Sequence, residues 1–236
     1  AYVRGNAADY DSWAELGNSG WSFKELLPFF KRSENHAQIG DMDQGYHGSN
    51  GELNVTLPTK FQSPYVEGFI SACAANGIPK NSDYNGSNQQ GSNVVQSTIK
   101  NGKRDSGATA FLKPILNRKN LTAISFAQVE KIIFEEKKAI AVQYIKGNKL
   151  IQVHTNKEII LSAGAFQSPQ LLMLSGIGET LELNKHGIRT IHELKGVGKN
   201  LQDHLFFPVC AQSKTQDGIN HYIPLLKQLK AAWNYF

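Results

Sequence analysis

The stretch GAFQSPQLLMLSGIG, residues 164–178, decides which fold this sequence encodes. It follows a nearly continuous apolar run at 158–163, which is typical of a strand buried in a parallel sheet. Ser168 and Pro169 are residue types that begin helices, so we expect a helix over 168–174. The segment therefore predicts a strand, a glycine turn and a helix in direct succession.

Small residues at this turn are compatible with a ligand site. Ala163 and Gly164 let the backbone approach a neighbour closely, and the N-terminus of the following helix attracts anions. Together they allow a place beside an anionic cofactor. The alternative is that small residues at a strand–helix turn serve packing alone.

The rest of the chain mixes helices with closely spaced strands. A capping box of Ser22 and Glu25 opens one helix, and Asp11 is the expected N-cap of a shorter one at 11–16. Further helices are expected at 64–76 and 107–118. Strands are expected at 51–56, 93–99, 121–129, 131–135, 139–145, 150–155 and 158–163. Those that are closely spaced and joined by hairpins are expected to form an antiparallel ribbon. This pattern predicts an α/β fold with an antiparallel insertion.

Composition and charge exclude several classes of protein. Hydrophobic side chains make up 40% of the chain and charged ones 19%, which allows a folded core. The net charge of +5 is spread along the chain without a basic run interleaved with aromatics, so no nucleic-acid partner is expected. No apolar run is long enough to span a membrane. Cys73 and Cys210 lack metal-ligand spacing, and we expect two buried free thiols.

The segment 164–178 resembles the second signature of the glucose–methanol–choline (GMC) oxidoreductases, with a small pair, Ser-Pro, paired aliphatics and Ser-Gly-Ile-Gly in order. Tyr2, Gly5 and Asp11 resemble the tail of the family's first signature. Further motifs continue in family order, so that the resemblance covers residues 1–208; they lie at 20–22, 27–30, 33–34, 47–48, 102–106, 111–112, 118–121 and 196–204.

The resemblance implies an α/β protein with a Rossmann-like FAD-binding domain and an antiparallel-sheet substrate domain, both of them partial. Residues 1–50 would belong to the FAD-binding domain and its flavin-covering loop, and 51–116 to the substrate domain. Residues 117–205 would return to the FAD-binding domain, and 206–236 would begin a second substrate-domain segment.

The same resemblance implies an FAD-dependent oxidoreductase that acts on CH–OH groups. Hydride would pass from an alcohol or sugar to the flavin N5, and the electrons would go on to a quinone or oxygen. The long loop and the helices resemble animal glucose dehydrogenase-like members. The alternatives are a truncated, non-catalytic relative that binds a partner, and a nicotinamide-dependent Rossmann enzyme, against which the flavin-family signature argues.

Four residues receive a cofactor role from the resemblance. The backbone of Val129 is similar to the position that reads the edge of adenine, although an ordinary strand residue is the alternative. Ala163 and Gly164 resemble the close-approach residues beside the adenosine part of FAD, and Ala1 lies near where the family's chain runs along the flavin. No metal site is expected.

The resemblance makes no residue of this chain catalytic. The family's catalytic histidine belongs beyond Phe236, so His204 is expected to brace a loop with Asp203, and His47 to form a structural turn. The sequence also has no Gly-x-Gly-x-x-Gly motif to cradle the FAD pyrophosphate. We therefore expect this chain alone to be inactive.

Both ends of the sequence read as cut, because it starts at Ala1 without a Met and stops within an expected helix. Localisation is left open by the sequence. The Asn-x-Ser/Thr sequons at Asn54, Asn85 and Asn120 favour an extracellular protein over an intracellular one.

A strand at 158–163 without parallel neighbours leaves open sheet edges and an exposed apolar face. We predict that the purified chain 1–236, on its own, is poorly soluble or partly molten. Near-ultraviolet circular dichroism during heating measures this, and a sharp cooperative transition would contradict the prediction.

Overall fold

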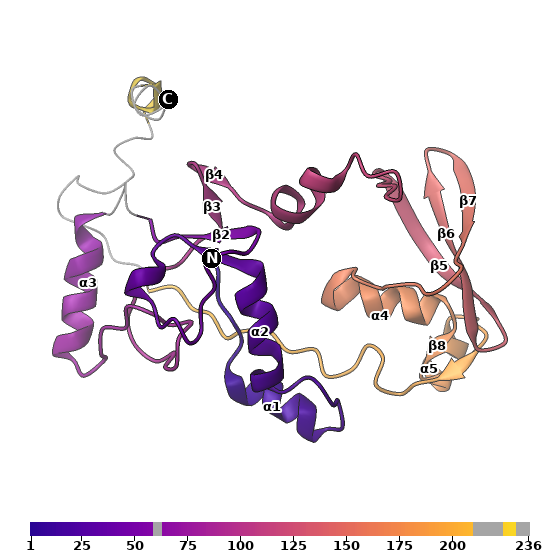
Figure 1. Cartoon of the computed structure of the whole chain (residues 1–236). Coiled ribbons are helices and arrows are strands. Elements are labelled where there is room, and N and C mark those ends of the chain that lie inside the picture. The colour runs from indigo at the N-terminus through magenta and orange to yellow at the C-terminus, as the bar shows by residue number, and fades with distance from the viewer. Residues whose placement is uncertain (59–62, 210–223, 230–236) are drawn as a thin grey trace. The chain divides into compact units, whose positions relative to one another are not determined.

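A computed structural model describes residues 1–58, 63–209 and 224–229 (Figure 1). The chain divides into two compact units; of the described residues, the first unit holds 1–121 and 224–229, and the second holds 122–209. The helices of the first unit are α1 (Ala7–Glu15), α2 (Phe23–Ser33) and α3 (Pro64–Ala75), with the short helical turns η1 (Ile39–Asp41), η2 (Ala108–Leu112) and η3 (Lys113–Ile115). Its strand pairs are parallel β1 (Glu34–His36) with β2 (Leu53–Val55), and antiparallel β3 (Ile99–Lys100) with β4 (Lys103–Arg104).

Capping residues explain where the first helices begin. The predicted capping box at α2 is confirmed, since Glu25 accepts the backbone N–H of Ser22 at 3.1 Å. The prediction for α1 is wrong by several residues, because Asn6 and not Asp11 is the N-cap. The carboxylate of Asp11 instead accepts the backbone N–H of Phe23 at 2.9 Å and so joins α1 to the start of α2.

Two other predictions for this unit are only partly right. The helix expected at 107–118 is a π-helical turn followed by a 3-10 turn that contains Pro114, whose missing N–H and ring prevent a regular α-helix there. The strand expected at 93–99 is confined to β3, with one further bridge between Ser97 and Thr56. The strand at 51–56 and the helix at 64–76 are confirmed as β2 and α3.

Glycines let the loop after β1 approach the end of α2 at backbone distance. A Cβ at Gly48 would lie 1.9 Å from the carbonyl oxygen of Lys31, and a Cβ at Gly51 would lie 2.2 Å from the carbonyl carbon of Ser33. Any other residue type would push the loop away from the helix. This close contact places His47, which directly precedes Gly48, in the interior of the unit.

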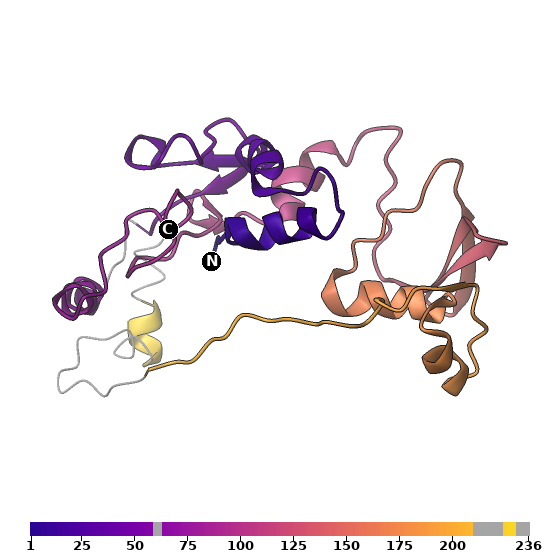
Figure 2. The ribbon, with the colours of Figure 1, turned by 90° about the horizontal axis from the view of Figure 1, so that it is seen from below.

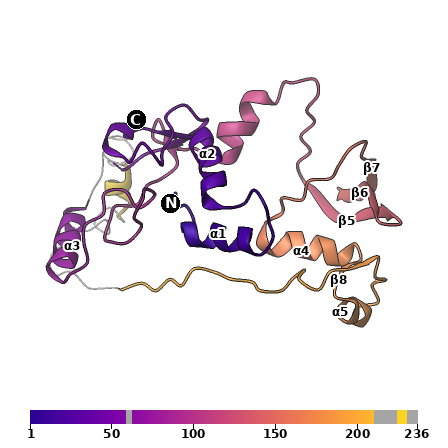
Figure 3. The ribbon, with the colours of Figure 1, turned by 60° about the horizontal axis from the view of Figure 1, so that its bottom comes forward.

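The second unit is an antiparallel ribbon with helix α4 beside it (Figures 2 and 3). The ribbon has the strand order β5 (Ala127–Glu135), β6 (Lys138–Lys146) and β7 (Lys149–His154). The predicted ribbon is confirmed, but the strands expected at 121–129 and 131–135 are one strand, β5, with a register shift between Val129 and Lys131. After the ribbon come α4 (Gly164–Leu174), α5 (Thr180–Lys185) and a parallel pair of β8 (Ile177–Gly178) with β9 (His192–Glu193).

The segment before α4 departs from the prediction. Residues 158–163 form no strand, and Ile160 is 79% exposed. A parallel strand exists only through hydrogen bonds to neighbours, and the described residues offer this segment none. The helix also begins at Gly164 and not at Ser168, whose hydroxyl oxygen accepts the backbone N–H of Ala163 at 3.0 Å from inside the helix.

The Ser-Gly-Ile-Gly end of the quoted stretch fastens α4 to the ribbon. The buried hydroxyl of Ser175 accepts the backbone N–H of Ile132 at 2.8 Å and donates to the carbonyl of Leu171. Gly176 has a φ of +83°, and a Cβ there would lie 2.6 Å from the carbonyl oxygen of Arg189. Packing therefore accounts for Ser175 and Gly176. For these two positions the structure supports the alternative interpretation, in which the small residues of the signature serve packing alone.

Cys73 is a free, half-buried thiol, and Cys210 lies outside the described residues. Within the described part of the chain, no helix has the length and hydropathy needed to cross a bilayer.

Replacing Ser175 by Ala would leave the N–H of Ile132 without its partner. We expect a loss of about 1–3 kcal/mol in unfolding free energy and faster hydrogen exchange at the Ile132 amide. The matched control is Ser162→Ala, because Ser162 is exposed. Equal exchange rates at Ile132 in the two variants would show that the bond does not fasten the helix.

Candidate cofactor site

The first turn of α4 offers backbone donors to a ligand. Gly164 has a φ of +87°, and nothing lies within 4 Å of the position that its Cβ would occupy. No side chain caps the helix, so the N–H groups of its first turn lack both an intrahelical partner and a cap. Such donors at a helix N-terminus suit an anionic or strongly polar group.

Val129 lies in β5, which is an edge strand of the ribbon. Its side chain is half-buried, and it pairs with Tyr144 of β6. In an antiparallel ladder, alternate residues of an edge strand turn their N–H and C=O groups away from the neighbouring strand. The N–H of Ile132 is used in this way by Ser175, so this edge does hydrogen-bond to groups outside the sheet.

The four predicted cofactor residues fall in two places. Val129 lies on β5 and Ala163–Gly164 lie at the start of α4, and these two elements pack against each other in the second unit. Ala1 is exposed and belongs to the first unit. The residue after it, Tyr2, donates its backbone N–H to the C=O of Gln96 in the loop before β3. Their cofactor roles stay predictions.

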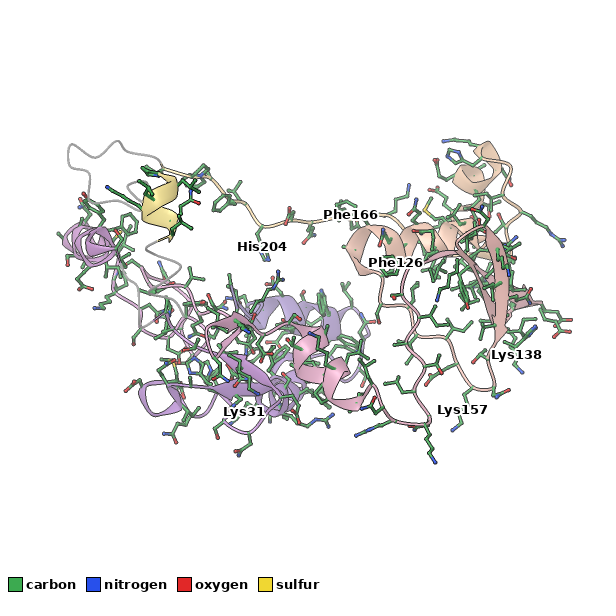
Figure 4. All side chains as sticks on the ribbon, turned by 90° about the horizontal axis from the view of Figure 1, so that it is seen from above. Lys31, Phe126, Lys138, Lys157, Phe166 and His204 are labelled. Atoms are coloured by element: carbon green, nitrogen blue, oxygen red, sulfur yellow. The ribbon has the colours of Figure 1, made fainter. Side chains whose placement is uncertain are left out.

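A groove of about 870 Å³ runs along α4 and the segment 196–201. Phe166, Met173 and Leu201 are among its apolar walls, and Lys199 adds a charge that pairs with Glu179 at 3.0 Å. Phe166, labelled in Figure 4, is 74% exposed. The volume is in the range of small-molecule sites. Val129, Ala163 and Gly164 do not line this groove.

The first unit contains a buried charged network that the sequence analysis missed. Arg4 donates to the carboxylate of Glu34 at 2.7 Å, and both side chains are buried. The same carboxylate lies 3.0 Å from Nδ1 of His47 and accepts the backbone N–H of Gly48 at 2.9 Å. Nε2 of His47 lies 2.9 Å from Asp83, whose side chain is 11% exposed. The motifs at 33–34 and 47–48 contain Glu34 and His47, two members of this network. Their spacing in the sequence does not indicate that the two side chains bond to each other.

Each charge in this network changes the proton affinity of its neighbours. Burial alone would raise the pKa of Glu34, but the bonds from His47 and Gly48 and the charge of Arg4 outweigh it and lower that pKa. Burial alone would lower the pKa of His47, but the carboxylates of Glu34 and Asp83 outweigh it and raise that pKa. His47 therefore closes the predicted turn, and both of its ring nitrogens also face carboxylates inside the unit.

Glu34, His36 and His47 place three metal-ligand atoms within 4.8 Å of one another. Their hydrogen bonds do not suit a metal ion, however. Both ring nitrogens of His47 face carboxylates. Nδ1 of His36 accepts the N–H of Gln38, so the neutral ring carries its proton on Nε2 and has no free lone pair there. We assign the cluster to charge pairing.

Two other groups of predicted residues also find their places. His204 is exposed, and Asp203 accepts its backbone N–H at 2.8 Å, a bond between neighbours that braces no other part of the described chain. Among the sequon asparagines, Asn54 bonds to Asp105 and Asn85 is 2% exposed, which leaves Asn120 as the exposed one.

Known proteins resemble this chain over most of its length. The family model described as GMC oxidoreductase matches residues 1–206. An alcohol dehydrogenase (acceptor) of Pseudomonas putida is 43% identical over 222 residues, which is 92% of this chain and 40% of that protein. An oxygen-dependent choline dehydrogenase of Rhizobium etli (strain CIAT 652) is 43% identical over 206 residues, covering 87% of this chain and 37% of that one.

Among solved structures, an FAD-dependent oxidoreductase from Chaetomium thermophilum matches with a TM-score of 0.78 at 36% identity, over 86% of this chain and 37% of that one. The chain thus spans about 40% of the length of the curated relatives it matches. The resemblance to animal glucose dehydrogenases stays a prediction.

Replacing Arg4 by Met would leave the buried carboxylate of Glu34 without its guanidinium partner. We expect a loss of about 3–5 kcal/mol in the unfolding free energy of the full protein, measured with denaturant. The control is Arg32→Met, because Arg32 is exposed, and its expected effect is within about 0.5 kcal/mol. Similar losses in the two variants would contradict the structural role of Arg4.

Proposed function

The chain belongs to the GMC oxidoreductase family, and we propose that the whole protein is an FAD-dependent oxidoreductase acting on the CH–OH group of a small alcohol or sugar. The observation that carries this proposal is the match to the family model over residues 1–206. The named relatives support the reaction class, since they are an alcohol dehydrogenase and a choline dehydrogenase.

The residues of this chain fit a dinucleotide cofactor. When bound, FAD supplies the acceptor for the hydride that leaves the alcohol carbon. The uncapped N–H groups of α4 would hold polar atoms of its adenosine part, and Gly164 would keep that space free of a side chain. The edge backbone of Val129 would read the donor and acceptor groups of adenine.

The chain's own chemistry in this proposal is binding, not proton transfer. We assign no catalytic base among these residues, so this chain alone is expected to be inactive. The electron acceptor is proposed only as a quinone or oxygen, because the relatives' names differ on this point. The substrate is proposed only as a class.

The full protein, once purified, is expected to be yellow and to bleach when its alcohol is added without oxygen. Visible absorption spectroscopy with a panel of alcohols, choline and sugars measures both properties. A colourless protein that takes up no added FAD would sink the proposal, because the family's reaction depends on the flavin.

Replacing Gly164 by Ala tests the cofactor role of this turn. The methyl group would enter the open space before α4, so we expect at least about a tenfold weaker affinity for FAD, which corresponds to about 1.4 kcal/mol. The control is Gly147→Ala, since Gly147 also has a positive φ, +58°, and nothing within 4 Å of its Cβ position. Both variants carry a similar backbone penalty, so equal FAD affinities would contradict the role of Gly164.

A further inference from the structure

The buried charged network joins four segments that are far apart in sequence. Arg4 comes from the N-terminal segment 1–5, Glu34 from β1, His47 from the turn at 43–47 and Asp83 from the loop at 81–90. Glu34 and His47 are 0% and 2% exposed, so water contributes little to holding these charges. The four segments are therefore linked by charge pairing in the interior.

The hydrogen bonds of His47 determine its charge. An ionised carboxylate only accepts hydrogen bonds, and a carboxylate faces each of the two ring nitrogens of His47. A neutral ring would turn a lone pair toward one of them. The groups that face the ring are Glu34 and His36 of β1, Asp83, and Arg4 through Glu34. Nδ1 of His36 accepts the N–H of Gln38, so His36 is neutral, and a protonated His47 gives the network two positive and two negative charges.

We propose that protonated His47 is the positioning residue that holds the N-terminal segment 1–5 against the loop at 81–90, and that loss of its proton loosens this segment. We call this contact between segment 1–5 and the loop at 81–90 the latch. The inference does not depend on the proposed enzyme activity. Without the proton, a ring that still donates from Nδ1 to Glu34 turns the lone pair of Nε2 toward the carboxylate of Asp83, so the bond that holds the loop of Asp83 is lost. The network then keeps one uncompensated negative charge in the interior.

The backbone contacts of the segment would follow the latch. The N–H of Arg4 donates to Asn85 at 2.8 Å, and the side chain of Gln89 donates to the C=O of Arg4 at 3.0 Å. The N–H of Tyr2 donates to the C=O of Gln96 at 2.7 Å. Residues 4–7 and 85–90 also form most of the wall of a polar pocket of about 370 Å³. The state of His47 therefore controls the shape of this pocket.

The direction of the pH effect follows from the two shifted groups. The pKa of His47 is raised above its ordinary 6.5, so its contribution is complete below about pH 6.5 and is lost as the pH rises through the folded-state pKa. The pKa of Glu34 is lowered from its ordinary 4.5, so its contribution is present above that pH and is lost in stronger acid. The latch is expected to be firmest between about pH 4.5 and 6.5.

Hydrogen exchange of the full protein, followed from pH 5.5 to alkaline pH, tests the latch. After correction for intrinsic exchange, protection of the Tyr2 and Arg4 amides should fall at least about tenfold as His47 titrates, by an amount that equals about 1.4 kcal/mol. The amide of Ile132, held by Ser175 in the other unit, should show no such step. A flat profile at Tyr2 and Arg4 would overturn the proposal.

Two variants and one control separate the latch from a merely structural role. Asp83→Asn keeps an accepting oxygen but removes a charge that raises the pKa of His47, so the step should move to lower pH. In His47→Gln the step should vanish, whereas His204→Gln should keep it, because His204 is exposed. A step that persists in His47→Gln would overturn the proposal.

A direct measurement needs no variant. The imidazole ¹⁵N shifts of His47 in the unaltered protein should show two protonated nitrogens at pH 6. One unprotonated ring nitrogen at that pH would overturn the proposal. This test holds even if none of the variants folds.

Discussion

Burying a polar group without a partner costs free energy, and this constraint governs the main polar contacts of both units of the protein. Glu34 is its clearest case, because a fully buried carboxylate collects Arg4, His47 and the N–H of Gly48. In the second unit the buried hydroxyl of Ser175 does the same for the N–H of Ile132. Removing either acceptor would leave a donor without a partner, so these few bonds fix which segments touch.

The candidate site lies where exposed backbone donors lack a cap. The first turn of α4 has no capping side chain, and the glycine that opens it faces empty space. A helix N-terminus with neither cap nor covering side chain is suited to an external partner. Because the chain belongs to the GMC oxidoreductase family, we propose that this partner is FAD, with Val129 on the adjacent strand as a second contact.

Local signals in the sequence predicted several elements that short-range chemistry decides, although they misplaced the starts of α1 and α4. The capping box at Ser22, the hairpins of the ribbon and the helix that begins at Pro64 all depend on neighbours within a few residues. Long-range partners could not be read in this way. The strand expected at 158–163 needs parallel neighbours, and the charge pairs of His47 depend on residues 13 and 36 positions away. From the sequence alone, a histidine beside a glycine in a turn cannot be told from a histidine that pairs with buried carboxylates.

A structure of the full protein purified with its cofactor would show where FAD binds. We expect the adenosine part of FAD at the first turn of α4, with adenine against the backbone of Val129 and no side chain between the ligand and Gly164. An FAD bound elsewhere, with the first turn of α4 covered by protein side chains, would contradict the cofactor role of this turn. In that case the small residues of the signature would serve packing alone, as those at Ser175 and Gly176 do.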